Sequence, residues 1–267
     1  VWAWGPSLES WPVATGEIEG GPDSPELWGE LAQLIGRTWP HAEGGRLPVE
    51  AWGVDSGYGT ANVYAFCSRY SHVKALDGRD GWGLSPLRRG PVGEVRGPDG
   101  LLARARVWQV GTWDLKRALF EGLGCAVDKA GAGVPGKIHL PGWVDKAWLE
   151  ELTAETLIQK QDARTGIVSE ERWKRIRRRN EALDLWVYCA ALAKARGCGV
   201  PGAEPDWVEL RNRLHAQADL EGLWDRPTRP VEPVTPVEPV NAFGGGAPAE
   251  RVESLAERYA RLNGGSQ

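Results

Sequence analysis

The chain has 267 residues, a composition ordinary for a soluble globular protein, and a formal net charge of −4. This charge argues against non-specific nucleic-acid binding as the whole function, although it leaves room for a local basic surface. No apolar run approaches the ~20 residues that would cross a bilayer, and the N-terminus lacks the basic and apolar regions of a secretory signal. The cysteines have no paired spacing, which fits reduced thiols in a cytoplasmic compartment.

The first part of the chain predicts strands and helices that alternate. Residues 1–19 have the alternation of two strands joined by a turn, and a helix is expected to begin after Ser24 as its N-cap. The short apolar run over 47–54 predicts a buried strand that ends in Asp55. Glycine-rich turn chemistry follows, and Thr60 is expected to cap the next helix.

Two further strands and a helix are expected over the middle of the chain. The strands cover 72–76 and 103–110, and the helix covers 111–123. Glycines, prolines and arginines are frequent over 78–100, which predicts a long loop or insertion. The segment 131–138 nearly matches a phosphate-binding Walker A pattern, but its last position is not Ser or Thr and no helix can follow it, so a glycine-rich surface loop is the better interpretation.

The second half begins with a short helix over 143–152 and a β-hairpin with an exposed tip over 155–174. A basic run over 172–179 leads into a strongly apolar helix that starts near residue 180, and a second helix covers about 205–220.

Composition divides the chain into three parts. A globular domain covers 1–226, and a Pro/Gly-rich linker of polyproline type covers 227–247. A short C-terminal helix or tail covers 248–267. Methionine is absent, also at position 1, so the chain is expected to begin inside a longer protein.

Asp55 is the first candidate for a functional carboxylate. It follows a buried strand and precedes a helix, which is where open α/β sheets place their ligands. The alternative is that Asp55 only stabilises the turn or the N-terminus of the helix.

A second acidic cluster lies on the late helix. Asn180, Asp184 and Tyr188 are four residues apart and share one face, and Glu181 lies beside them. Carboxylates on an apolar helix are costly to bury without a partner, and Mg²⁺ would compensate that cost. Two ions about 4 Å apart would clamp the attacking and leaving oxygens of a phosphodiester.

The basic run beside this cluster would supply cations for a DNA backbone, notably from Arg178 and Arg179. The alternative is that Glu181 and Asp184 are solvated or pair with arginines at helical spacing. The tryptophans are dispersed rather than interleaved with basic residues, which favours core or rim positions over a base-stacking platform.

Four segments in this order resemble the C-terminal nuclease domain of the lambda-type (GpA family) large terminase subunit of tailed bacteriophages. They are VDSGYGTANVYAFC, VWQVGTWDLKRALF, IHLPGWVDKAWLEELTAETLI and RRRNEALDLWVYCAALA. The resemblance implies an α/β fold with an RNase H-like mixed sheet flanked by helices. It also implies acidic residues that bind two Mg²⁺ or Mn²⁺ ions.

Carried onto this sequence, the resemblance makes Asp55 and Asp184 metal ligands and catalytic residues, with Glu181 assisting. Basic positions expected to face DNA are Lys116, Lys174, Arg175, Arg177, Arg178 and Arg179. The chain departs from the family pattern in three respects. The first (central) strand, with another catalytic aspartate, would lie before residue 1, and an ATPase domain would also lie upstream. Asp77 stands where the family tends to have a basic residue.

The sequence therefore predicts an Mg²⁺- or Mn²⁺-dependent endonuclease domain that cuts concatemeric double-stranded DNA during phage packaging. Expected partners are the small terminase subunit and the portal protein, in the host cytoplasm. One alternative is another RNase H-like phosphodiesterase of resolvase or transposase type. The other is a non-catalytic packaging module that docks through its Pro-rich linker and terminal helix.

Overall fold

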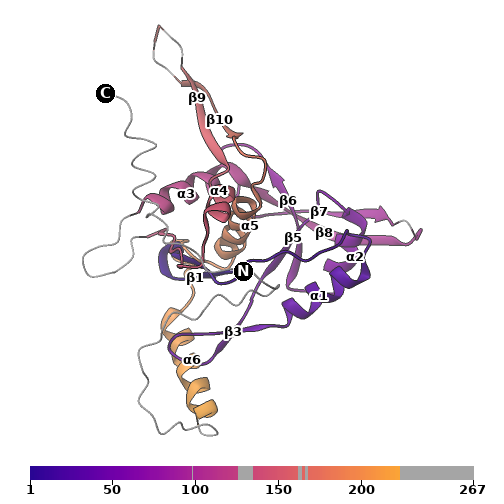
Figure 1. The fold of residues 1–267 in the computed structure, drawn as a ribbon, viewed down its shortest axis with the longest axis vertical. Helices are drawn as coiled ribbons and strands as arrows, with labels where there is room; N and C mark the ends of the chain where they lie inside the picture. The colour runs from indigo at the N-terminus through magenta and orange to yellow at the C-terminus, as the bar shows by residue number, and fades with distance from the viewer. Residues whose placement is uncertain (98, 126–134, 162–163, 166–167, 223–267) are drawn as a thin grey trace.

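The computed structural model describes residues 1–97, 99–125, 135–161, 164–165 and 168–222. The described part contains six α-helices and ten β-strands, arranged as in Figure 1. The helices are α1 (Pro25–Ile35), α2 (Thr60–Cys67), α3 (Thr112–Gly124), α4 (Lys146–Leu152), α5 (Glu181–Ala195) and α6 (Trp207–Gly222). The strands are β1 (Trp2–Trp4), β2 (Ser10–Pro12), β3 (Thr38–Pro40), β4 (Arg46–Pro48), β5 (Trp52–Asp55), β6 (Val73–Arg79), β7 (Arg88–Arg96), β8 (Leu102–Gly111), β9 (Glu155–Gln161) and β10 (Val168–Arg175).

A four-stranded mixed sheet organises the fold, with the strand order β5-β6-β8-β7. The first three strands are parallel, and β7 runs antiparallel to β8 at the edge. The other strands form three antiparallel pairs: β1 with β2, β3 with β4, and β9 with β10. The expected mixed α/β class is confirmed.

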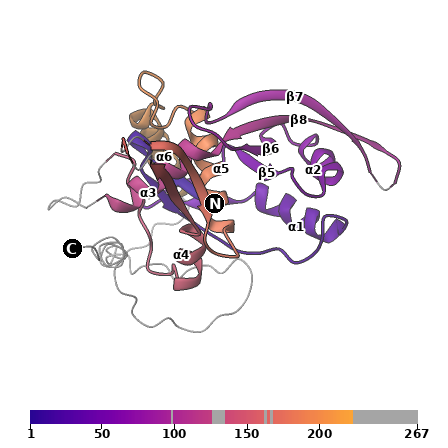
Figure 2. The ribbon, with the colours of Figure 1, turned by 90° about the horizontal axis from the view of Figure 1, so that it is seen from above.

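Helices pack on both faces of this sheet because successive side chains of a strand alternate between faces. Ala75 of β6 and Val107 of β8 pack in one cluster with α1 and α2. Their neighbour Leu76 packs in the other cluster, which α5 dominates. Helix α5 therefore covers the face opposite to α2, as Figures 1 and 2 show.

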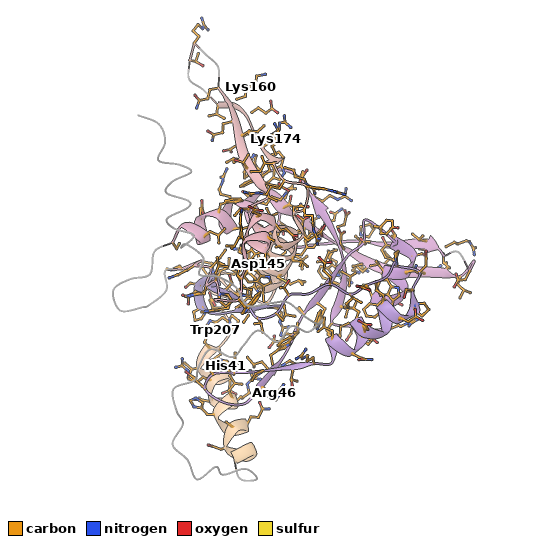
Figure 3. The ribbon with its side chains drawn as sticks, viewed as in Figure 1. His41, Arg46, Asp145, Lys160, Lys174 and Trp207 are labelled. Atoms are coloured by element: carbon orange, nitrogen blue, oxygen red, sulfur yellow. The ribbon has the colours of Figure 1, made fainter. Side chains whose placement is uncertain are left out.

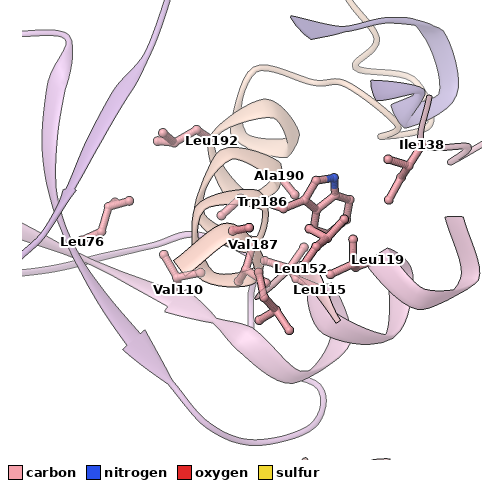
Figure 4. Packing of buried hydrophobic residues seen from close by; sticks show 13 residues of the cluster. Leu76, Val110, Leu115, Leu119, Ile138, Leu152, Trp186, Val187, Ala190 and Leu192 are labelled. Carbon is pink, nitrogen blue, oxygen red and sulfur yellow. The ribbon is translucent and has the colours of Figure 1, made fainter. Parts of the chain in front are cut away.

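Helix α5 is the centre of the larger core. Its Trp186 is only 1% exposed, and it packs among aliphatic side chains from α3, α4 and the sheet (Figure 4). Full burial of such a side chain contributes roughly 1.5–3 kcal/mol. Because this packing fixes α5 against the ends of β6 and β8, it also fixes the polar residues at the start of the helix.

The β9–β10 hairpin projects from the body of the molecule, with Lys160 and Lys174 along it (Figure 3). It confirms the hairpin expected over 155–174, and Arg164 and Thr165 near its tip are exposed.

Three expectations about local structure were wrong. The run 47–54 is not one strand: β4 pairs with β3, and β5 begins only at Trp52. Thr60 is the first helical residue rather than the cap. Gly59 holds the cap position with a φ of 61°, and the Thr60 hydroxyl donates to the carbonyl of Ser56. The segment 78–100 is not a loop, because it completes β6 and contains the nine residues of β7.

Several expected features fall outside the described residues. They are the start of the Walker-like segment (131–134), most of the hairpin tip, the Pro/Gly-rich linker and the C-terminal helix or tail. Among the helices of the described part, none is both long enough and apolar enough to cross a membrane.

Candidate active site

Asp55 lies at the carboxyl end of β5, where the structure exposes it to solvent. Its Oδ1 accepts a hydrogen bond of 3.0 Å from the backbone N–H of Gly57. The next residue, Ser56, is buried and donates its hydroxyl to the carbonyl oxygen of Leu76 at 2.7 Å. This hydrogen bond links the end of β5 to β6. Asp55 therefore stabilises its turn, as the alternative interpretation of the sequence expected.

Asp184 lies in the first turn of α5, where a carboxylate is favoured by the helix dipole. Asn180, 3% exposed, precedes the helix, and its side-chain amide donates to Asp184 Oδ2 at 2.8 Å. The same amide nitrogen lies 3.4 Å from Glu155 Oε1 at the start of β9. Asn180 therefore holds the Asp184 carboxylate in one orientation and joins it to a second acid.

Glu155 also belongs to a buried ion pair. Lys116 Nζ of α3 is 2.7 Å from Glu155 Oε2, and both side chains are only 8% exposed. A charge in such a place is tolerated only when it is paired and hydrogen-bonded. The pair links α3 to the base of the β9–β10 hairpin. Together with Asn180 and Asp184 it forms one polar network inside the core.

Among the acids of the described residues, Asp184 has an unusual electrostatic environment. Burial raises its pKa to about 6, against the opposing effect of the Lys116 ammonium. The neighbouring carboxylates of Glu155 and Glu181 raise it further, and Arg175 lowers it. A carboxyl group in this state is stabilised by any additional cation that approaches it.

Tyr188, one turn after Asp184, connects the acids of the helix and the sheet. Burial raises the pKa of its phenol, and the carboxylates of Asp55, Asp184 and Asp77 raise it further. A Cβ atom at Gly78 of β6 would lie 3.0 Å from the Tyr188 hydroxyl and 3.3 Å from Thr112 Cγ2, so a larger residue there would require one of these side chains to shift. The two acids expected to form the site, although far apart in sequence, therefore both act on the same phenol.

The basic residues expected to contact DNA have different surroundings. Lys116 is buried in its ion pair, so the expectation that it faces DNA does not fit its position. Arg177 donates to the carbonyls of Glu150 and Thr153, which places it at the C-terminal end of α4. These two side chains are used inside the fold because each satisfies groups that would otherwise be buried without a partner.

The other basic positions lie nearer to solvent. Lys174, Arg175 and Arg178 are exposed. Arg179 is exposed but pairs with Glu17 and, at 2.9 Å, with Glu151.

Glu181 is also exposed at the start of α5. Its charge raises the pKa of Asp184.

Sequence reasoning missed Glu155 and misjudged Lys116 as members of this site. One signal was available, because Lys116 stands between Leu115 and Leu119 on the apolar side of its helix, where a charge needs a partner. Nothing local identifies Glu155 as that partner. Asp77, expected only to disturb a DNA path, lies close enough to act on Tyr188.

The site offers carboxylate oxygens, which are the ligands that Mg²⁺ prefers. Within the described residues, no group of three or more acidic, histidine or cysteine side chains is arranged to hold a metal. Mg²⁺ needs fewer protein ligands, since one or two carboxylates complete their octahedron with waters and phosphate oxygens. Asp55 and Asp184 are carboxylates of this kind, and burial raises the pKa of Asp184 to about 6. The residues therefore fit Mg²⁺ or Mn²⁺ in donor type.

These features define a mixed α/β domain in which carboxylates from a strand end and from a covering helix both raise the pKa of the Tyr188 phenol. Comparison with known protein families identifies the family of this domain. Residues 1–218 match the family described as the terminase large subunit gpA, endonuclease domain, and the chain belongs to this family.

A similar protein is the terminase large subunit of Escherichia phage lambda, which is 26% identical over 198 residues. That match covers 72% of this chain and 29% of the lambda protein, so the chain spans less than a third of this relative. No solved structure matches the chain significantly.

Proposed function

We propose that the chain is a metal-dependent endonuclease domain that cuts concatemeric double-stranded DNA during phage genome packaging. The observation that supports this best is the match of residues 1–218 to the terminase endonuclease family, in a fold where Asn180 orients the half-buried Asp184 carboxylate beside the buried Lys116–Glu155 pair. The proposal includes an RNase H-like arrangement, in which an acid at a strand end and an acid on a covering helix act together.

In this proposal Asp55 and Asp184 hold the divalent ions, and Glu181 orients water at the exposed side. When bound, the ions would polarise the scissile phosphate and stabilise charge on the attacking and leaving oxygens. The residues of the protein position the carboxylates that would bind the ions. Asn180 keeps the Asp184 carboxylate oriented, as outer hydrogen-bond partners do for metal ligands in general.

Two other residues shape the electrostatics of the site. Tyr188 stays protonated at neutral pH because burial and three carboxylates disfavour the phenolate, so its hydroxyl can donate a hydrogen bond to a neighbouring oxygen. Arg175, exposed at the base of the hairpin and close enough to lower the pKa of Asp184, is placed to contact a phosphate.

The proposed partners follow from the family. Double-stranded DNA is the substrate, and the small terminase subunit and the portal protein are assembly partners. An ATPase domain would accompany this domain in a complete large subunit, since the match covers only 29% of the lambda protein.

The decisive test is Asp184→Asn. This change keeps the size of the side chain and the hydrogen bond to Asn180 possible, but it removes the charge that a metal needs. We expect loss of Mn²⁺-dependent plasmid nicking and of Mn²⁺ binding in calorimetry, with an unchanged circular dichroism spectrum. Asp219→Asn on the exposed side of α6 is the matched control and should cut like the wild type.

Undiminished nicking by the Asp184 variant would contradict the proposal, and so would a wild-type chain that neither binds Mn²⁺ nor nicks DNA. Preferential cleavage of branched over linear duplex would instead indicate a phosphodiesterase of resolvase type.

A further inference from the structure

One face of the β7–β8 pair is directed away from α1 and α2, and α5 covers this face at its Trp108 end. Ala103, Ala105 and Val107 of β8 turn toward α2 and pack in its cluster. Alternation along the strand then places Arg104 and Arg106 on the opposite face. Figure 2 shows β7 and β8 arching over α2.

Cations gather on this face, where Arg106 donates to the Gly90 carbonyl at 2.9 Å and Lys74 is half-buried. The antiparallel register pairs Arg96 with Leu102 and Arg89 with Trp108, which adds two cations from β7 beside those of β8. Lys74 of the neighbouring β6 belongs to the same face, because its ammonium lies 5.3 Å from the centroid of the Trp108 ring. We call this set the arginine face; it consists of Lys74, Arg89, Arg96, Arg104 and Arg106.

Acidic side chains are scarce there. Among the described residues that pair between β7 and β8, Glu94 is the acid on this face. Its Oε1 lies 2.9 Å from Arg104 Nε. The Arg104 side chain is still 60% exposed, and Val92 beside Arg106 is 50% exposed. Five cations against one carboxylate contrast with the net charge of −4 of the whole chain.

The residue types indicate which ligand this face would bind. Arginine presents a planar fork of donors that matches phosphate oxygens, and exposed arginines that alternate along a strand recur every ~6–7 Å. Lys74 occupies one side of the Trp108 ring, which leaves that aromatic poorly placed to stack on an unpaired base. A phosphate backbone therefore fits better than single-stranded bases.

The location relates the arginine face to the acidic site. Leu76 pairs with Trp108 and Gly78 with Val110, so the strands of this face continue directly toward Tyr188. From Arg104 to Trp108 the strand covers about 13 Å at ~3.3 Å per residue. This length is well within one turn of a B-form duplex, which is about 34 Å.

We propose that the arginine face binds the phosphate backbone of double-stranded DNA and thereby holds the duplex beside the acidic site. This inference rests on the proposed function, because it assigns a substrate surface to the same nuclease. It differs from the basic positions expected from sequence, none of which lies on β7 or β8.

Binding is measured separately from cutting, by fluorescence anisotropy of a labelled 30-base-pair duplex in EDTA at several salt concentrations. The variant is Arg89→Gln/Arg104→Gln, whose side chains are exposed. Loss of two phosphate contacts should reduce the slope of log affinity against log salt by about 2, which is on the order of 50-fold in affinity at 0.1 M salt.

The matched control is Arg211→Gln/Arg213→Gln on α6, which removes the same charge from arginines that are 64% and 67% exposed. It should keep the wild-type slope, because charges farther than ~10 Å from the duplex are largely screened at this salt. The single variant Arg89→Gln provides a milder test, with a slope change of about 1. Thermal unfolding of each variant establishes that it is folded.

The outcomes separate the two proposals. A wild-type slope in the β7–β8 variant, an equal loss in the control, or no duplex binding by the wild type overturns the inference. Salt-dependent binding that requires the arginine face, in a protein that never cuts, would support the inference while refuting the nuclease assignment. Tighter binding to single strands than to duplex would also overturn it.

Discussion

The buried pair of Lys116 and Glu155 allows a quantitative prediction about stability. Both side chains are 8% exposed, and their charged atoms are 2.7 Å apart. Removal of one member leaves the other charged and buried, which costs about 3–5 kcal/mol in proteins generally. We therefore expect Lys116→Met to lower the free energy of unfolding by that amount, and Glu155→Gln to lower it comparably.

A double-mutant cycle distinguishes a true pair from two independent losses. In Lys116→Met/Glu155→Gln neither charge remains, so the variant should lose at least ~2 kcal/mol less than the sum of the single changes. Urea unfolding followed by tryptophan fluorescence gives all four values. Lys146→Met breaks an exposed pair with Glu150, whose atoms are 3.6 Å apart, and should change stability by no more than ~0.5 kcal/mol.

Additive single effects would refute this reasoning, because they would mean that Lys116 and Glu155 do not depend on each other. Single costs as small as that of Lys146→Met would refute it as well, since the pair would then behave as if it were solvated.

Three further predictions concern the site and the core. Asn180→Ala should weaken Mn²⁺ binding about 10- to 100-fold in calorimetry, because Asp184 loses the donor that orients it, and unchanged binding would remove Asn180 from the site. Gly78→Ala should cost about 1–3 kcal/mol in thermal unfolding, because the new methyl group meets the Tyr188 hydroxyl; addition of Tyr188→Phe should recover part of the loss, and no recovery would contradict that contact. Burial raises the pKa of Cys67 to about 12, so at pH 8 iodoacetamide should label this thiol only after urea unfolds the chain; rapid labelling of the native protein, seen by mass spectrometry, would be inconsistent with its burial.

The helices were the part of the fold most accessible from sequence, because their signals are local. Ser24 caps α1 by accepting the N–H of Leu27 at 3.3 Å, as the Ser-Pro pair predicted. The apolar spacing of α3 and α5 gave both helices nearly at their observed bounds. These features need only residues within one or two turns of each other, so one segment contains all the information.

Strand β7 shows why the rest of the fold was harder to predict. Its glycines and Pro91 resemble a loop, yet each has a place in an edge strand. Pro91 lies at the register shift between Arg89 and Val92, where a ladder hydrogen bond is not required. A Cβ atom at Gly93 would lie 2.5 Å from the Tyr64 hydroxyl, so α2 can pack closely only on glycine. Both reasons depend on partners that a single segment does not reveal.

The candidate site depends on the same kind of distant partner. The pattern around Asp184 predicted a carboxylate in need of positive charge, and the structure places the Lys116 ammonium near it. That ammonium is already paired with Glu155, however, so it satisfies one buried carboxylate and leaves the other with a pKa of about 6. Had Lys116 been free on the surface, as expected, Asp184 would have had no internal cation at all. Because burial is the largest cause of the raised pKa of Asp184, a divalent ion bound there, as proposed, should lower that pKa, and titration with and without Mn²⁺ checks this.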